Sequence, residues 1–320
     1  MAKTKNILIF GATGLIGHHI TNAIVENNYR FDRIVVFTSP NTLYFKPDEI
    51  EALTSRGVEI IAGDITSEGD VNEAFNDIDT VVSCVGRTII HLQLQLIKLA
   101  DRHPDVKRFF PSEYGTDIDY GPSSANEKPL QQKLKVRAAL KGAKNLEYTY
   151  IVTGPYADAD NGLYLSAQPI EHEARGTFDV NRRRAVLLGT GDDKISLTTM
   201  RDVGSLVLAT LIRPDNVRNR ALRVNSFTTT PKEIVAEFEK QTGGEPWDVS
   251  FTSLEKLKKL EEQAWAKKDP KAGTITLRRI WTEGGTLYDQ RDNALIAMDW
   301  YMSSLEDAVS QAISVQTAAV

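Results

Sequence analysis

Short apolar runs rich in β-branched residues alternate with amphipathic stretches of helical period over the first half of the chain. The apolar runs predict six strands, at residues 6–10, 33–38, 58–63, 80–85, 108–110 and 147–152. The stretches between them predict helices at residues 16–26, 47–56, 68–75, 88–102 and 129–141. Strands that alternate with helices in this way form a parallel sheet with right-handed crossover connections.

The alternation ends after Gly154 and Pro155. The later part predicts short strands at residues 176–180, 185–188, 196–199 and 221–224, and helices at 202–212, 253–268, 304–315 and after a capping box at Thr230. We predict an α/β fold, a Rossmann-type doubly wound parallel sheet with a smaller C-terminal α/β substrate lobe. The NAD(P)-binding domain would cover residues 1–156 and the lobe residues 157–320, with a segment at about 200–228 returning to the main sheet.

The composition is that of an ordinary globular protein. Hydrophobic residues make up 41% and charged residues 25% of the 320 residues, which allows a large core and lacks the bias of disordered chains. A net charge of -5 without long basic runs argues against nucleic acid or anionic membrane as a partner. Cys84 is the single cysteine, and no apolar window reaches the roughly 20 residues of a membrane span, so we expect a cytoplasmic protein.

The most informative motif is a glycine-rich loop between the first predicted strand and helix, Gly11-Ala12-Thr13-Gly14-Leu15-Ile16-Gly17. A dinucleotide fingerprint occupies this place in Rossmann folds. Gly11 suits the tight turn, Gly14 lets the backbone approach a pyrophosphate, and Gly17 lets the helix pack on the strand. The helix start supplies free amides to the anion, so the cofactor site also includes Thr13, Leu15 and Ile16. A glycine-rich turn without a ligand is the alternative.

The end of the second strand distinguishes the two nicotinamide cofactors. NAD-dependent enzymes usually place a carboxylate there, about 20 residues downstream, to bind the ribose diol. Here the chain reads Phe37-Thr38-Ser39-Pro40, without a carboxylate to repel a 2′-phosphate. The hydroxyls of Thr38 and Ser39, with the ammonium of Lys46 a few residues on, can donate hydrogen bonds to that phosphate. NADP(H) is therefore preferred over NAD(H).

Residues after the third and fourth strands complete the predicted cofactor site. Asp64 can accept a hydrogen bond from the adenine amine, with Ile65 beside it, but Asp64 suits a turn cap equally well. Gly86 and Arg87 follow the fourth strand and are expected to line the cofactor cleft. Arg87 can meet a phosphate or a substrate acid, and a surface salt bridge is the alternative.

The usual catalytic pair of short-chain dehydrogenases, Tyr-x-x-x-Lys, is absent. The nearest candidate is Lys133, in the helix predicted after the fifth strand, where it would face the nicotinamide ribose. A helical lysine considered alone is more often a surface charge, so spacing by itself does not assign a role to Lys133.

Three segments stand in a characteristic order and spacing. They are the glycine-rich loop, Arg108-Phe109-Phe110-Pro111-Ser112-Glu113-Tyr114-Gly115, and Lys133-Leu134-Lys135-Val136-Arg137 followed by Tyr148-Thr149-Tyr150. Together they resemble the isoflavone reductase-like branch of the NmrA-like, atypical short-chain dehydrogenase/reductase family, whose Phe-Pro-Ser-Glu-Phe-Gly signature borders the nicotinamide. The resemblance covers residues 5–160 well, and the remainder is more similar to the fungal proteins than to the plant enzymes.

This resemblance implies that Lys133 is the catalytic lysine, which binds the nicotinamide ribose and assists proton transfer directly or through water. Two departures limit what can be carried over. Ser39 stands where plant members usually have an arginine, and Thr153-Gly154-Pro155-Tyr156 replaces an Asn-Cys-Phe segment. We assign Gly154 to the cofactor site, but a phenylpropanoid substrate is not implied.

Three tyrosines are candidates for the substrate wall. Tyr114 and Tyr164 suit contact with a flat substrate, although core tyrosines are as common. Tyr156 is either an acid near the nicotinamide or an aromatic wall, and we favour the wall. The histidines lack metal-ligand spacing, so no metal is expected. The sequence has no Gly-x-Ser-x-Gly motif, which argues against a hydrolase.

We therefore expect an NADPH-dependent reductase of an aromatic or conjugated small molecule, such as an enone, quinone methide, ketone or imine. A non-catalytic NAD(P)-sensing regulator and a redox-neutral dehydratase or isomerase on the same fold are the alternatives. Lys133 favours an enzyme, because a sensor needs no lysine at the nicotinamide. The sequence identifies neither the substrate nor the choice between monomer and homodimer.

Overall fold

The computed structural model describes residues 4–160, 162–288 and 290–318. Seven strands form its main sheet, namely β1 (Asn6–Phe10), β2 (Arg33–Thr38), β3 (Glu59–Ala62), β4 (Thr80–Ser83), β5 (Arg108–Phe110), β6 (Glu147–Val152) and β10 (Arg220–Arg223). They lie in the order β10-β6-β5-β4-β1-β2-β3, and the neighbouring strands are parallel. The predicted Rossmann-type sheet is confirmed, and β10 joins it from the second half of the chain.

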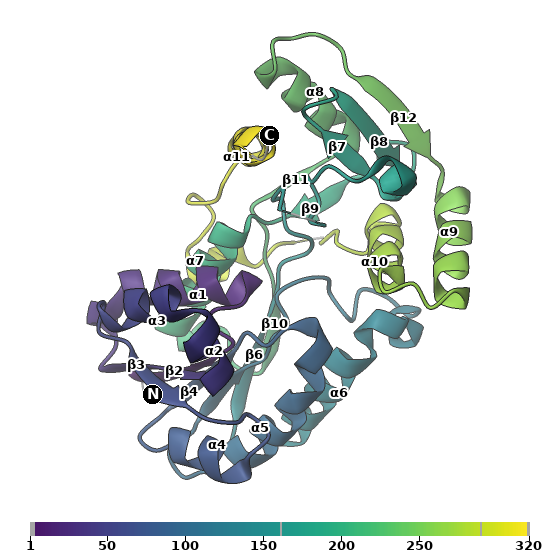
Figure 1. Cartoon of the computed structure of the whole chain (residues 1–320). Helices are drawn as coiled ribbons and strands as arrows, with labels where there is room; N and C mark the ends of the chain where they lie inside the picture. Colours follow the sequence, from purple (N-terminus) through teal and green to yellow (C-terminus); the bar gives the residue numbers. More distant parts are fainter. Residues whose placement is uncertain (1–3, 161, 289, 319–320) are drawn as a thin grey trace.

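Helices cover both faces of the main sheet (Figure 1). One face carries α1 (Leu15–Glu26) and α7 (Met200–Ile212), and the other carries α4 (Glu68–Ala74), α5 (Gln93–Ala100) and α6 (Gln131–Gly142). The alternation along β1 explains the two cores, because Ile7 and Ile9 point to the first face while Leu8 and Phe10 point to the second. All four are almost fully buried, and each stabilises the fold by about 1.5–3 kcal/mol.

The second half of the chain builds a smaller region above the carboxyl edge of the main sheet (Figure 1). Its strands are β7 (Thr177–Asp179), β8 (Arg184–Leu188) and β12 (Asp248–Thr252) in one sheet, and β9 (Ile195–Leu197) and β11 (Phe227–Thr229) in another. Its helices are α8 (Pro231–Gln241), α9 (Leu254–Ala266), α10 (Ala272–Thr282) and α11 (Leu305–Ala318). Thr230 and Glu233 form the predicted capping box at the start of α8.

Several elements differ from the sequence expectation. The helices α2 (Pro40–Phe45) and α10 and the strands β11 and β12 were not predicted. The predicted helix at 47–56 is α3 (Pro47–Thr54). The one at 88–102 is replaced by η2 (Arg87–Leu92) followed by α5, and Ile89 inside η2 has non-helical dihedral angles. The remaining short helices are η1 (Asn28–Arg30), η3 (Ser124–Asn126), η4 (Lys128–Leu130), η5 (Ile170–Arg175), η6 (Pro214–Asn216) and η7 (Asn293–Ile296). The division at residue 156 stays a prediction.

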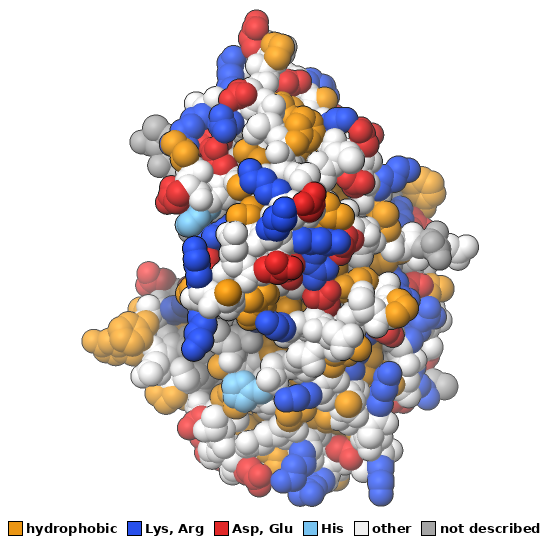
Figure 2. Space-filling view, turned by 90° about the vertical axis from the view of Figure 1, so that its right-hand side faces the viewer, with side chains coloured by type: hydrophobic (Ala, Val, Ile, Leu, Met, Phe, Trp, Pro, Cys, Tyr) orange, Lys and Arg blue, Asp and Glu red, His pale blue; other side chains and the backbone are white. Residues whose placement is uncertain are grey.

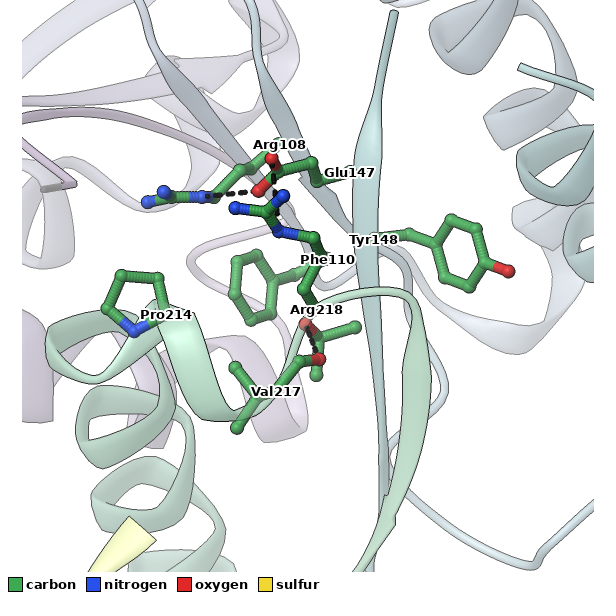
Figure 3. A pocket seen from close by; sticks show the side chains of 8 residues that line it. Arg108, Phe110, Glu147, Tyr148, Pro214, Val217 and Arg218 are labelled. Atoms are coloured by element: carbon green, nitrogen blue, oxygen red, sulfur yellow. Dashed lines mark hydrogen bonds and ion pairs between the residues drawn. The ribbon is translucent and has the colours of Figure 1, made fainter. Parts of the chain in front are cut away.

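The surface gives two further observations. On the face over α6, α9 and α10, Lys and Arg side chains mix with Asp and Glu side chains (Figure 2). A hollow of about 10 Å³ lies where β5 and β6 begin, beside an ion pair of Arg108 with Glu147 at 3.3 Å (Figure 3). It has room for about one water molecule, so it is too small for an organic ligand. None of the helices within the described ranges is both long and apolar enough to cross a bilayer.

Candidate active site

The glycine-rich loop connects β1 to α1 at the carboxyl edge of the sheet, where open parallel sheets bind ligands. Gly11 has a φ of 77°, and a Cβ on it would lie 2.7 Å from the carbonyl oxygen of Cys84. A Cβ on Gly17 would lie 2.0 Å from the carbonyl oxygen of Gly11. Gly14 is the N-cap of α1 and has no capping side chain, so the first amides of α1 stay available to an anion. This cradle fits a pyrophosphate.

The end of β2 carries the residues predicted to receive a 2′-phosphate. Thr38 is buried, and Ser39 is the N-cap of α2, where its hydroxyl accepts a hydrogen bond from the backbone amide three residues on at 3.2 Å. The Lys46 ammonium donates to the carbonyl oxygen of Thr13 at 2.8 Å and pairs with Glu49 at 3.0 Å. Lys46 therefore lies against the glycine-rich loop, where a phosphate would compete with Glu49 for its charge.

Asp64 follows β3 and makes the contacts of a turn cap. Its carboxylate accepts hydrogen bonds from the amide and the hydroxyl of Thr66, both at 2.8 Å. These bonds hold the pKa of Asp64 below its usual value. Asp64 is exposed and Ile65 is half-buried beside it. A contact of this pair with adenine stays a prediction.

Lys133 lies on α6 and donates a hydrogen bond to the carbonyl oxygen of Glu113 at 2.8 Å. The Glu113 carboxylate is buried and accepts two hydrogen bonds from Arg137, each at 3.1 Å. This ion pair fixes α6 against the loop that follows β5, and so fixes the position of Lys133.

The surroundings of Lys133 change its acidity. Removal from water lowers its pKa to about 8; the carboxylate of Glu113 opposes this shift, and the positive charges of Arg87 and Arg137 add to it. Lys133 is therefore still charged at neutral pH, but it can exchange a proton far more readily than a surface lysine.

Tyr114 and Tyr156 are tied together at the end of β5 and β6. The Tyr156 hydroxyl donates to the carbonyl oxygen of Tyr114 at 2.6 Å. Burial raises the pKa of both phenols above the usual range. A phenol that holds its proton so firmly and uses it in a structural hydrogen bond is a poor acid, which agrees with the interpretation of Tyr156 as a wall. Gly154 stands two residues before Tyr156, after the end of β6, and has a φ of 69°.

These groups meet at a cleft of about 760 Å³. Ten residues predicted for the site line it: Gly14, Leu15, Ile16, Gly86, Arg87, Tyr114, Lys133, Gly154, Tyr156 and Tyr164. The other eight predicted residues do not line the cleft. They lie at or after the ends of β1, β2 and β3 and are Gly11, Thr13, Gly17, Thr38, Ser39, Lys46, Asp64 and Ile65. The volume suits the nicotinamide end of a dinucleotide together with a small molecule.

The opposite wall of the cleft consists of residues that the sequence analysis missed. They come from α9, α10 and the turn between them, and are Trp265, Asp269, Pro270, Gly273, Thr274, Leu277 and Trp281. The Trp281 indole donates to the hydroxyl of Thr116 at 2.7 Å and joins α10 to the loop after β5. The helical spacing of Ala272, Ile275 and Ile280, all buried, was the signal that could have predicted α10.

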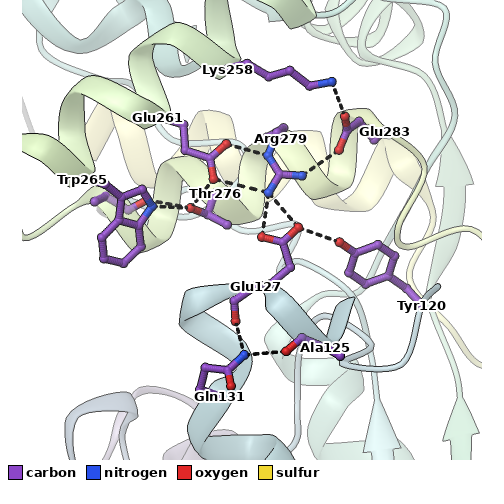
Figure 4. A network of polar contacts seen from close by, with 11 residues as sticks. Tyr120, Ala125, Glu127, Gln131, Lys258, Glu261, Trp265, Thr276, Arg279 and Glu283 are labelled. Carbon is purple, nitrogen blue, oxygen red and sulfur yellow. Dashed lines mark hydrogen bonds and ion pairs between the residues drawn. The ribbon is translucent and has the colours of Figure 1, made fainter. Parts of the chain in front are cut away.

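A network of ion pairs between side chains holds this wall in place (Figure 4). Arg279 on α10 binds Glu127, which precedes α6, at 2.7 Å, and also binds Glu261 and Glu283. The Tyr120 hydroxyl donates to the same Glu127 carboxylate at 2.9 Å. Because Glu127 lies just before α6, the network connects the missed wall to the helix that carries the candidate lysine.

Comparisons with known proteins show the family and a similar fold. A model of the NmrA-like family matches residues 3–268. The chain is 29% identical to an isoflavone reductase of Medicago sativa, over 83% of this chain and 84% of that protein. It is 31% identical to the oxidoreductase aprR of Aspergillus flavus, over 80% of each. A structure of leucoanthocyanidin reductase from Vitis vinifera in binary complex with NADPH superposes with a TM-score of 0.79 at 20% identity, over 97% of this chain and 99% of that one.

Proposed function

The chain belongs to the NmrA-like family, and from this premise we propose that it is an NADPH-dependent reductase of an aromatic or conjugated small molecule. The resemblance to isoflavone reductase-like proteins that three motifs predicted is confirmed by the relatives. The observation that carries the proposal is the place of Lys133. Its ammonium lies in the same cleft as the glycine-rich loop and three aromatic side chains, with a pKa of about 8.

The residues present fit NADP(H). Glycine is required for the tight turn and for the packing of α1 on β1, since a Cβ on Gly11 or Gly17 would collide with backbone, and the uncapped amides that follow Gly14 suit a pyrophosphate. Lys46 would bind the 2′-phosphate together with hydroxyls, and no carboxylate stands between residues 38 and 46 to repel it. When bound, NADPH supplies the hydride. The remaining proposed contacts are Thr13, Gly14, Leu15, Ile16, Thr38, Ser39, Asp64, Ile65, Gly86 and Gly154.

Lys133 would act on charge and on a proton. An ammonium beside the reacting atoms stabilises the negative charge that develops on a substrate oxygen, and the effect is large where water is excluded. A pKa of about 8 also lets Nζ hold a proton at neutral pH and release it to the product. The hydrogen bond from Nζ to the Glu113 carbonyl oxygen sets its position.

The rest of the chain would select the substrate. Tyr114, Tyr156 and Tyr164 line the cleft and can pack against a flat, conjugated molecule. We propose that residues 1–156 bind the cofactor and residues 157–320 form the substrate lobe, and that the protein works in the cytoplasm as a monomer or homodimer.

Turnover of the purified protein with NADPH or NADH against enones, quinones, ketones and imines tests the proposal. One substrate class should consume NADPH, with kcat/KM at least about 10-fold above that with NADH if a charged contact to the 2′-phosphate is made. With NADPH deuterated at its reactive nicotinamide carbon, the product should carry the deuterium. Product formation without net NADPH consumption would indicate a redox-neutral enzyme. Tight cofactor binding with no turnover would indicate the sensor.

A further inference from the structure

Positive charge dominates the lining of the cleft. The charged side chains among its lining residues are Arg87, Lys128, Lys133 and Asp269. Asp269 is already compensated, because its carboxylate pairs with Arg175 at 3.1 Å and accepts the Lys271 amide at 2.8 Å. The cleft is thus cationic in a chain whose net charge is -5, which points to an anionic ligand.

Arg87 has no hydrogen-bonding or ion-pairing partner for its guanidinium among the residues that the structure describes. The residue as a whole is exposed, so a ligand can reach it, while the protein around its guanidinium removes water from it and lowers its pKa. Its Nη1 lies 3.9 Å from the point where a Cβ on Gly273 would stand. Arg87 therefore extends from the end of β4 across to α10. The alternative that the sequence left open for Arg87, a surface salt bridge, is not formed within the described residues.

This place belongs to the substrate side of the cleft. The charge of Arg87 interacts with Tyr156 and with Lys133, the proposed catalytic residue, and all three line the same cleft. The amides that suit a pyrophosphate belong instead to the glycine-rich loop at the start of α1. An anion on Arg87 would also offset the repulsion between its guanidinium and the Lys133 ammonium.

Lys128 provides a second positive charge near aromatic rings. Its ammonium lies 4.6 Å from the centroid of the Trp265 ring, a cation–π contact that leaves it without a carboxylate partner among the described residues. The neighbouring Glu127 is occupied by Arg279. Trp265 and Trp281 both line the cleft beside these cations. Two flat rings with cations at hand suit an aromatic molecule that bears an acid.

Resting on the proposed reductase function, we propose that the substrate is an aromatic or conjugated carboxylic acid, whose carboxylate binds Arg87 while its ring packs against Trp265 and Trp281. Arg87 is then a specificity-determining residue. A guanidinium offers two parallel hydrogen bonds to a carboxylate, which a neutral amide or ester of the same shape cannot match.

Binding to the protein saturated with NADP⁺ tests this without requiring turnover. Calorimetry would compare cinnamate with cinnamamide, and 4-carboxychalcone with its methyl ester, on wild type, Arg87→Gln and the control Arg102→Gln, whose side chain is exposed away from the cleft. At least one acid should bind about 10-fold more tightly than its neutral partner in wild type and in Arg102→Gln, as expected for a charged hydrogen-bonded pair. Arg87→Gln should reduce that preference to about 2-fold or less.

The proposal is wrong if no acid binds more tightly than its neutral partner, or if the preference survives in Arg87→Gln. NADPH affinity of the same variant, measured alongside, identifies the other source of an anion. A loss of about 10-fold or more, without any preference for acids, would place Arg87 on a cofactor phosphate and overturn the proposal. Failure of both chalcones to oxidise NADPH would count against the reductase alone, because the acid preference is a binding measurement.

Discussion

The two walls of the cleft are built from different material. On the cofactor side the decisive surface is the backbone of the glycine-rich loop, where Gly11 and Gly17 have no room for a side chain, since a Cβ on Gly17 would lie 2.0 Å from a carbonyl oxygen. On the opposite side the surface is made of side chains such as Trp265 and Trp281, and a Cβ on Gly273 would make only ordinary contacts, the nearest at 3.7 Å. Substitutions in the first wall would therefore disrupt the backbone that suits a dinucleotide. Substitutions in the second wall would instead change the shape offered to the other ligand of the cleft.

The strongest way to break this comparison is Gly17→Ala. The new methyl group would collide with the Gly11 carbonyl and force α1 away from β1. We expect NADPH affinity to fall by about 100-fold or more and the free energy of unfolding to fall by about 3 kcal/mol. Calorimetry and urea unfolding measure both quantities. An NADPH affinity close to that of wild type would show that the cradle is not as tight as described.

Arg279→Met tests the wall that α9 and α10 form. The side chains of Glu127 and Glu261 are mostly buried, and the substitution removes the guanidinium that pairs with them. The free energy of unfolding should therefore fall by about 3–5 kcal/mol. The control is Lys258→Met, which removes a half-exposed partner of Glu283 and should cost about 1 kcal/mol or less. Urea unfolding compares the two variants. Equal losses would contradict the central place of Arg279.

The pH dependence of turnover tests Lys133, where the two walls meet. Its pKa of about 8 means that the ammonium predominates at neutral pH and is lost as pH rises through that value. If the charged form is needed, kcat/KM falls about tenfold per pH unit above the pKa. A profile that is flat up to pH about 10, where an ordinary lysine titrates, would show that the environment does not act on Lys133 as described.

The same shift has a consequence for stability. The unfolded chain keeps this lysine protonated up to about pH 10.4, so between the two pKa values the unfolded state binds more protons than the folded state. The contribution of Lys133 to the free energy of unfolding therefore rises with pH across that window, by an amount on the order of 1–3 kcal/mol. Lys133→Met should remove this rise, as urea unfolding at a series of pH values would show.

Gly273→Ala has the smallest expected effect. A methyl group fits beside Pro129 and Arg87 at ordinary contact distances, and alanine favours helix at this position in α10. The free energy of unfolding should rise by about 0.5–1 kcal/mol. NADPH affinity should stay unchanged while KM for bulky substrates increases. A loss of NADPH affinity would mean that the cofactor reaches this wall.

The same contrast explains what could be predicted from the sequence. Gly11 and Gly17 are constrained by backbone geometry, which repeats in all such folds, and the strand periodicity of residues such as Ile7 and Ile9 leaves the main sheet little alternative. Lys133 was a candidate from its place in the chain, but a catalytic role was assigned to it only through the resemblance, because nothing local separates it from Lys135 two residues on.

The wall that α9 and α10 form was missed for physical reasons. Trp265 lies in a segment rich in Lys and Glu that indicates a solvated helix, and its contact with the cleft depends on α10 packing nearby. The hydroxyl of Ser39 was assigned to a phosphate, although a serine before a proline also starts a helix, as it does in α2. Long-range packing such as that of Arg279 on Glu127 leaves no pattern in the sequence.

The most direct test of the reductase account compares Lys133→Met with Lys135→Met, an exposed lysine on the same helix. The measurement is single-turnover oxidation of NADPH with the best substrate, together with the dissociation constant for NADPH. Lys133→Met should lower turnover by about 100-fold or more while its NADPH affinity changes by about 3-fold at most, and Lys135→Met should match wild type. Turnover in Lys133→Met close to that of wild type would contradict the account.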